Sequence, residues 1–120
     1  MKVIIAGGRD FKDYGLLCRK ADYYLSRQDE IEIVSGTAKG ADKLGERYAD
    51  ERGYKITRFP ADWGTFGNSA GYRRNEEMAQ YADALIAFWN ERSKGTKHMI
   101  DLAELYKLKV RVITYKIETK

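Results

Sequence analysis

Short apolar runs alternate along the chain with longer segments in which apolar residues recur at helical spacing. Residues 3–6 form the run Val-Ile-Ile-Ala, which ends at two glycines, as a buried strand often does. In residues 14–27 apolar side chains recur every three or four positions, which predicts an amphipathic helix. The same criteria predict strands over residues 30–35, 55–59, 84–88 and 110–114, and helices over residues 41–52, 72–81 and 96–106, with Gly53 ending the first of these.

The order of these segments predicts the architecture. Strands that alternate with helices form parallel sheets through right-handed crossovers, with helices on both faces. We therefore expect an α/β fold, a three-layer Rossmann-like domain with a mostly parallel sheet of about five strands. Residues 84–88 are apolar throughout and indicate a central strand. Residues 61–70 are expected to form a loop, and residues 116–120 a polar tail.

Composition narrows the class of protein. The 120 residues suit one domain over 1–120, and 43% hydrophobic with 33% charged residues allow a packed core. Cys18 is the single cysteine, so no intramolecular disulfide forms, which favours a cytoplasmic setting, and its apolar surroundings indicate a core residue. We expect neither a signal peptide nor a membrane span, because no apolar run is long enough. The formal charge of +4 is spread along the chain without a basic block, which favours a mixed surface over a nucleic-acid-binding tail.

Three glycine-containing segments follow predicted strands, at the sheet edge where ligands bind in α/β folds. The first contains Gly7, Gly8, Arg9 and Asp10. Its glycines allow the backbone to approach a ligand closely, and Arg9 can pair with a phosphate. An ordinary strand-to-helix turn with a surface arginine has the same composition.

The second segment runs from Ser35 to Asp42 and opens a helix, where free backbone amides favour an anion. Asp42 either caps this helix or binds a ribose hydroxyl. The segment lacks the Gly-Lys-Ser/Thr sequence of P-loop proteins. Its candidate ligand-binding residues are Ser35, Gly36, Thr37, Lys39, Gly40 and Asp42.

The third segment, with Ser93, Lys94, Gly95 and Thr96, opens the last helix, and the same argument makes all four residues candidates to bind an anion. Trp89 lies just before it. Its indole either stacks on a base or covers the end of the sheet.

Arg73, Arg74 and Asn75 lie near the start of the helix predicted over residues 72–81. The helix dipole disfavours positive charge there, so the two arginines are candidates to meet an anion, unless neighbouring glutamates offset them in solvent. His98 is the only histidine, and we expect it at the surface. One cysteine and one histidine provide no recognisable metal cluster, and we expect no metal and no other cofactor.

In their order and spacing, these segments resemble the SLOG superfamily, and in particular its branch of YspA- and YpsA-related proteins. The superfamily is Rossmann-like and includes the LOG phosphoribohydrolases and the DNA-processing DprA proteins. The similarity also includes residues 59–63 and 82–88 and extends over nearly the whole chain. The resemblance implies a nucleotide site at the carboxyl ends of the strands.

The resemblance to the LOG enzymes is incomplete. These enzymes cleave the N-glycosidic bond of nucleoside monophosphates and carry an arginine before a Met-containing helix, then the signature PGGxGTxxE. Arg74 and Gly95-Thr96 match this pattern, which implies a catalytic role for Arg74 if the chain is a hydrolase. Met99 occupies the position of the glutamate, and Asp101, two residues later, should face a different direction on a helix.

The sequence therefore predicts binding, as a sensor, of a nucleotide or nucleotide-derived phosphate ligand. A nucleotide N-glycosidase stays open as an alternative, with Asp10, Asp42 or Asp101 as its acid. A single-stranded nucleic-acid-binding module is the other alternative, because nine tyrosines and two tryptophans provide material for base stacking. The LOG-type relatives commonly form dimers, which implies a homodimer.

Overall fold

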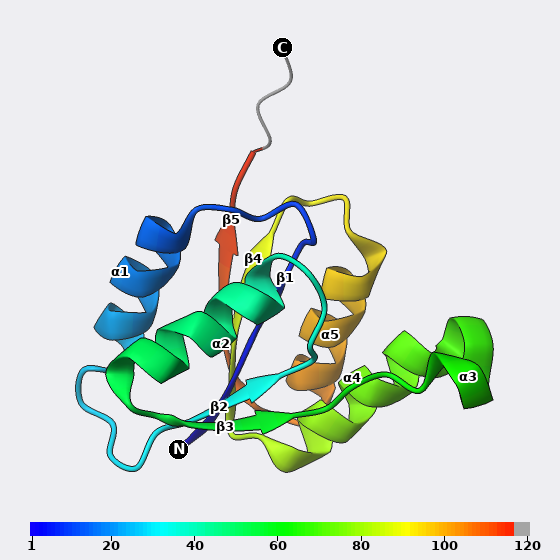
Figure 1. The fold of residues 1–120 in the computed structure, drawn as a ribbon, viewed down its shortest axis with the longest axis horizontal. Coiled ribbons are helices and arrows are strands. Elements are labelled where there is room, and N and C mark those ends of the chain that lie inside the picture. Colours follow the sequence, from blue (N-terminus) through cyan, green and yellow to red (C-terminus); the bar gives the residue numbers. More distant parts are fainter. Residues whose placement is uncertain (117–120) are drawn as a thin grey trace.

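A computed structural model describes residues 1–116 and shows five parallel strands in one sheet, with the order β3-β2-β1-β4-β5 (Figure 1). The strands are β1 (Lys2–Gly7), β2 (Glu32–Ser35), β3 (Lys55–Arg58), β4 (Ala84–Trp89) and β5 (Lys109–Thr114). The helices are α1 (Tyr14–Leu25), α2 (Ala41–Arg52), α3 (Trp63–Phe66), the 3-10 turn η1 (Gly67–Ser69), α4 (Ala70–Tyr81) and α5 (Lys94–Leu105).

The sheet separates two helical layers. Helices α1 and α2 pack on one face, over a core that includes Ile5 and Phe88. Helices α4 and α5 pack on the other face, over a core that includes Ile4 and Leu85. Neighbouring residues of a strand point to opposite faces, so the continuously apolar β1 and β4 serve both cores. These features confirm the predicted three-layer α/β architecture.

Local sequence explains where most elements begin and end. Helix α2 has the predicted bounds and ends at Gly53, whose φ of +72° allows its amide to donate to the carbonyl groups of the last turn. Strand β2 begins at Glu32, two residues later than predicted, because Glu30 has a φ of +50° that does not fit an extended strand. The predicted tail lies outside the described residues, except for Lys116.

The prediction of a loop over residues 61–70 is wrong. This segment forms α3 and η1, and α4 begins at Ala70, before the predicted start. Asp62 caps α3 by accepting a hydrogen bond from the Thr65 amide at 3.1 Å. A single helical turn is too short to show apolar periodicity, so its glycines and polar residues predict a loop. Helix α3 and the turn η1, residues 63–69, instead form a lobe that projects beyond the sheet (Figure 1).

The topology reverses direction beside β1. Strand β1 pairs with both β2 and β4, and the helices that follow β1 and β4 cover opposite faces of the sheet. Their connecting loops therefore diverge and leave a crevice between them, above the carboxyl ends of the strands. Within residues 1–116, no helix has the length and apolar character needed to cross a membrane.

Candidate functional site

A cavity of about 480 Å³ occupies this crevice, a size within the usual range of small-molecule sites. Four segments contribute to its walls: the loop after β1, the start of α2, the lobe with the first turns of α4, and the loop after β4 with the first turns of α5. The lining residues are Ala6, Gly7, Gly8, Arg9, Asp10, Ala38, Asp42, Trp63, Asn68, Gly71, Tyr72, Arg74, Asn75, Met78, Asn90, Ser93, Gly95, Thr96 and Met99.

The loop after β1 supplies one fixed carboxylate and one available cation. Asp10 accepts a hydrogen bond from the Tyr115 hydroxyl and another from Asn90 Nδ2 at 3.1 Å. Burial, together with the bond to Asp10, raises the pKa of Tyr115 far above its usual value, so the hydroxyl stays a neutral donor. Arg9 is exposed at the cavity and forms no side-chain hydrogen bond or ion pair with the rest of the described chain. Arg9 is therefore the side chain of this loop that is available to a ligand.

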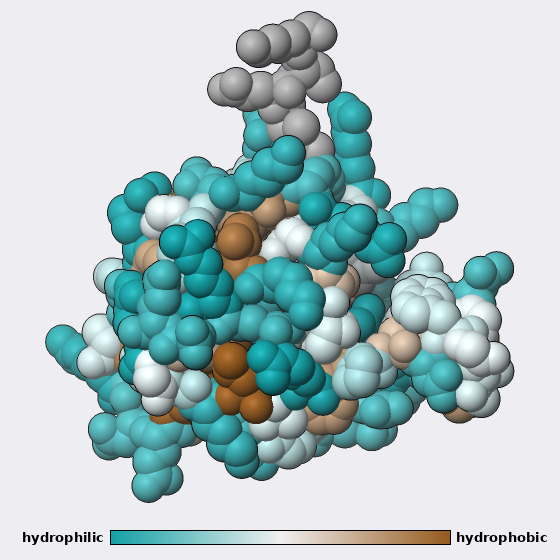
Figure 2. Space-filling view, viewed as in Figure 1, coloured by the Kyte–Doolittle hydropathy of each residue, from teal (hydrophilic) through white to brown (hydrophobic). Residues whose placement is uncertain are grey.

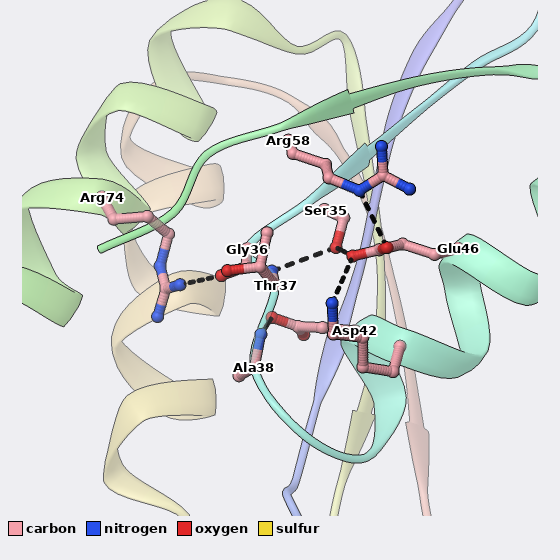
Figure 3. A network of polar contacts seen from close by, with 9 residues as sticks. Ser35, Gly36, Thr37, Ala38, Asp42, Glu46, Arg58 and Arg74 are labelled. Atoms are coloured by element: carbon pink, nitrogen blue, oxygen red, sulfur yellow. Dashed lines mark hydrogen bonds and ion pairs between the residues drawn. The ribbon is translucent and has the colours of Figure 1, made fainter. Parts of the chain in front are cut away.

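The loop after β2 folds back on itself (Figure 3). The buried Ser35 hydroxyl donates to Glu46 Oε2 at 2.6 Å and accepts from the Thr37 amide at 3.0 Å. The Asp42 carboxylate accepts from the Ala38 amide at 3.1 Å. These hydrogen bonds all have partners within the protein. Ser35 and Thr37 therefore stabilise the loop, and neither lines the cavity.

Asp42 is the one sequence candidate of this loop that lines the cavity; Ser35, Gly36, Thr37, Lys39 and Gly40 do not. Lys39 is exposed outside it. Asp42 does not cap α2, because the N-cap residue is Gly40, which makes no side-chain bond. The Ala41 amide donates to the Gly8 carbonyl at 3.2 Å, so this helix start is partly satisfied by the protein itself.

Close packing explains two glycines of the same loop. Gly40 has a φ of +79°, and a Cβ atom on it would lie 2.3 Å from the Gly8 carbonyl oxygen. A Cβ atom on Gly36 would lie 2.8 Å from Asp42 Oδ2 and 2.9 Å from Arg74 Nη1. These glycines let the loop after β2 touch the loop after β1 and the guanidinium of Arg74. Their role is to bring the walls of the cavity together.

Glu46 belongs to this network and was missed in the sequence. Besides the bond from Ser35, it accepts a hydrogen bond from Arg58 Nε at 2.9 Å (Figure 3). Lys43 Nζ lies 3.6 Å from Glu46 Oε2. Burial alone would raise the pKa of Glu46, but the bonds from Ser35 and Arg58 hold it below its usual value. The available signal was its position one turn after Asp42, on the same face of α2.

Arg74 is held in place by α4 and by the loop after β2. Its Nε donates to Asn75 Oδ1 at 3.0 Å, and its Nη1 donates to the Gly36 carbonyl. With Oδ1 turned to Arg74, the amide nitrogen of Asn75 lies 3.4 Å from the Gly95 carbonyl and 3.3 Å from His98 Nδ1. Asn75 donates to both, so His98 Nδ1 accepts and the ring proton is on Nε2. Arg74 is thereby connected to α5.

His98 keeps part of its surface exposed, but its ring is also fixed by neighbouring side chains. The ring is half-buried and packs edge-on against Tyr72, with 4.5 Å between the ring centroids. Burial lowers the pKa of His98, which favours the neutral ring that accepts from Asn75.

Arg73 points away from the cavity. Its Nε donates to Ser69 Oγ at 3.1 Å, and its guanidinium lies over the Phe66 ring at 4.4 Å from the centroid. Arg73 is held on this outer side of α4 by Ser69 and Phe66. Of the two arginines, only Arg74 lines the cavity.

The loop after β4 brings the N-terminus of α5 to the cavity. Ser93 is the N-cap and accepts from the Thr96 amide at 3.2 Å and from its hydroxyl at 2.9 Å. Trp89 Nε1 donates to the Ser93 carbonyl at 3.1 Å, so this indole fixes the loop and does not line the cavity. Lys94 is exposed outside it. The Gly95 amide has no partner within residues 1–116 and lies where an anion would be favoured.

The structure confirms that Met99 and Asp101 face different directions. Met99 is buried and lines the cavity. Asp101 is exposed and forms an ion pair with Lys97. The cavity therefore has a thioether at the position where the LOG signature places a glutamate, and Asp42 is its most buried carboxyl group.

The lobe and the first turn of α4 supply lining residues that were not predicted as ligand contacts, notably Trp63, Asn68 and Tyr72. Trp63 ends the segment 59–63 that takes part in the family resemblance, which was the available signal. Among residues 1–116, no three His, Cys, Asp or Glu side chains are grouped to hold a metal ion.

The carboxyl group of Asp42 gives a testable pH dependence. Burial raises its pKa to about 6, against the opposing hydrogen bond from Ala38 and the charge of Arg74. The folded state binds this proton more tightly than the unfolded chain, so the contribution to stability is present at low pH and lost as pH rises through about 6. We expect the wild type to lose stability relative to Asp42→Asn between about pH 4 and pH 7.

Urea unfolding of both proteins across this range measures the effect. The comparison with Asp42→Asn is needed because Glu32 and Glu46 have lowered pKa values and act in the opposite direction. Parallel pH profiles for the two proteins would contradict the assignment to Asp42.

Two solved structures share the fold of this chain. The chain is similar in structure to DNA processing protein A (DprA) from Streptococcus pneumoniae, with a TM-score of 0.73, 20% identity and coverage of 97% of this chain and 51% of that chain. It is also similar to DNA processing protein A from Helicobacter pylori, with a TM-score of 0.65, 20% identity and coverage of 93% and 64%. The chain thus spans 51% and 64% of these two proteins, and identity this low shows a shared fold only.

No curated protein sequence matches the chain. Residues 1–66 match the family described as the YspA, cpYpsA-related SLOG family. The match includes the loops after β1 and β2 and extends to the lobe. Because it covers more than half of the 120 residues, the chain belongs to the YspA, cpYpsA-related SLOG family.

Proposed function

We propose that residues 1–120 act as a single nucleotide-binding domain of sensor type, which holds a nucleotide or nucleotide-derived phosphate ligand in the cavity above β1 and β4. The observation that carries the proposal is the pair of arginines, Arg9 and Arg74, that line a cavity at the topological switch point. Membership of the SLOG family supports the same class of ligand.

Of the charged residues that line the cavity, Arg9 is the one with no partner among the described residues. Asp10 already accepts from two donors, and Asp42 lies beside Arg74. Arg9 has no internal acceptor in the described chain, so its charge is left for a ligand. The free amide of Gly95 at the start of α5 adds a second donor of the kind that binds phosphate.

Thermal unfolding against a panel of nucleotides tests the proposal, with chromatographic analysis of products on the same samples. A ligand at a hundredfold excess over its Kd stabilises the native state by about 2.7 kcal/mol. Stabilisation without product supports a sensor. The absence of any shift with nucleotides would overturn the proposed function.

Removing the available cation should weaken binding without harming the fold. We expect Arg9→Ala to lower the affinity for nucleoside monophosphates by about tenfold to a hundredfold, the value of a charge-assisted hydrogen bond of about 1.5–3 kcal/mol. The unfolding temperature of the free protein should not change, because Arg9 is exposed and has no partner in the described chain. Arg73→Ala is the matched control, since this arginine is also exposed but lies outside the cavity. Equal affinity losses in both variants would contradict a specific site.

A nucleotide N-glycosidase is the second candidate function, and the observation that favours it is Asp42. This buried carboxyl group lines the same cavity as Arg74 and could stabilise an oxocarbenium-like transition state. Arg74 would then hold the phosphate or ribose of the substrate. Release of free base from a nucleoside monophosphate, lost in Asp42→Asn, would establish the activity.

Single-stranded nucleic acid is a further candidate partner. The structure of DNA processing protein A from Helicobacter pylori is described with a single-stranded DNA binding mode. In this chain, Trp63, Phe66 and Tyr72 expose aromatic rings on or beside the lobe, with Arg73 next to them. Salt-dependent retention of a labelled oligonucleotide, reduced by Phe66→Ala, would favour this partner over a mononucleotide. We also propose a homodimer, which the elution mass tests.

A further inference from the structure

Two large aromatic side chains, one on the lobe and one on the first turn of α4, lie at the cavity with much of their surface uncovered. Trp63 is 51% exposed and Tyr72 is 46% exposed. Trp63 belongs to a helix of a single turn, where its ring lies against Gly71: a Cβ atom there would be 3.3 Å from Trp63 Cη2. Exposed aromatic surface of this size is not explained by packing of the fold, because neither ring belongs to a core.

The position of these two rings distinguishes them from other exposed apolar residues. Trp63 and Tyr72 both line the cavity, whereas Tyr23, Phe66, Leu105 and Val112 do not. Tyr72 is also held in orientation, since its ring packs edge-on against His98. The lobe projects beyond the body of the molecule in pale colours in Figure 2, next to a mostly hydrophilic surface.

The cavity therefore offers two chemically different sets of contacts. Arg9 and the Gly95 amide come from the loops after β1 and β4 and offer charge and hydrogen-bond donors. Trp63 comes from the lobe and Tyr72 from the first turn of α4, and both offer aromatic faces. A ligand that uses both sets of contacts carries an anionic group and a planar aromatic ring in one molecule.

We propose that Trp63 and Tyr72 stack on the base of the ligand, so that the site requires a nucleobase and selects nucleotides over simple sugar phosphates. This inference rests on the proposed function and adds where the base lies and which residues recognise it. Stacking of a base on an aromatic side chain is favourable for every base, because each has a π-face. This pair of rings, which we call the clamp, therefore accepts any aromatic base, and the arginines bind the phosphate.

The test compares AMP, GMP, CMP and UMP with ribose 5-phosphate, which carries the same phosphate without a base. Affinity is measured by titration calorimetry and by quenching of tryptophan fluorescence. We expect at least one nucleotide to bind at least tenfold more tightly than ribose 5-phosphate and to quench the emission. Of the two tryptophans, Trp89 does not line this cavity, so quenching should disappear in Trp63→Phe.

Trp63→Ala and Tyr72→Ala should each weaken nucleotide binding by about tenfold and leave the affinity for ribose 5-phosphate unchanged. Tyr23→Ala is the control, since this tyrosine is 75% exposed on α1 and does not line the cavity. Circular dichroism and the unfolding temperature verify that the variants fold. The two alanine variants lie on different helices, so they test the clamp separately.

The outcomes separate this inference from the proposed function. Equal affinities for nucleotides and ribose 5-phosphate, or nucleotide binding unaffected by both alanine variants, would overturn the clamp while the anion site stands. Binding of oligonucleotides with no binding of mononucleotides would also overturn it. Absence of binding by all five compounds would overturn the anion site and, with it, the clamp.

Discussion

Replacing Arg74 with alanine is expected to lower the free energy of unfolding by about 3 kcal/mol and to remove nucleotide binding. The guanidinium donates to the Gly36 carbonyl and to Asn75 Oδ1, and its charge lies next to the buried carboxyl group of Asp42. The variant leaves two acceptors without their donor and a buried acid without its neighbouring cation. Urea unfolding at pH 7.5 measures the stability, and calorimetry with nucleotides measures the binding.

Two further variants identify the cause of this loss. In Arg74→Ala/Asp42→Asn the side chain at position 42 is a neutral amide that needs no neighbouring cation. Part of the stability should therefore return, while binding stays absent. Arg74→Lys keeps the charge but not the planar group that reaches both acceptors, and should have intermediate stability. If the double variant is no more stable than Arg74→Ala, the charge of Asp42 is not the source of the cost.

The second large effect is expected at Gly40. Gly40→Ala should destabilise the protein by about 3 kcal/mol or more, because a Cβ atom would lie 2.3 Å from the Gly8 carbonyl oxygen and the φ is +79°. The two loops would have to separate, which displaces both Arg9 and Asp42. We therefore expect weaker nucleotide binding in the fraction that folds, measured by chemical unfolding and calorimetry.

Gly53 provides the matched comparison. It also has a positive φ, +72°, but a Cβ atom on it would meet nothing within 4 Å. Gly53→Ala should therefore cost only the backbone term of about 1–2 kcal/mol and leave ligand affinity unchanged. Because ψ is −126° at Gly40 and +24° at Gly53, the difference between the two variants measures the contact between the loops together with the less favourable backbone conformation of Gly40. Equal losses of stability would contradict the predicted clash at Gly40.

The fold was predictable from the sequence wherever periodicity or a strong end signal was present. Residues 41–52 have helical periodicity and a glycine after them, and the structure begins and ends the helix at those residues. The lobe was not predictable in this way, because Trp63–Phe66 is one turn long and its cap, Asp62, looks the same as a loop aspartate.

The candidate site was predictable by segment but less so by residue. Glycine-rich loops at the ends of parallel strands do surround the cavity, as their topology requires. Which side chains reach it depends on hydrogen bonds between distant residues. Ser35 turns inward because its hydroxyl donates a hydrogen bond to Glu46, and Arg73 turns outward because Ser69 and Phe66 contact it. Such pairings are set by tertiary packing and leave no periodic trace in a single sequence.

The hydrogen bond between Asn75 and His98 makes the imidazole a built-in reporter of the cavity. Because the chain contains one histidine, its ring protons give a single set of NMR signals that need no assignment by mutagenesis. Asn75 connects that ring to Arg74, so a ligand that draws the guanidinium away from Asn75 also changes the bond at His98 Nδ1. The occupancy of the cavity can therefore be followed from the titration curve of one side chain, in solution and without a label.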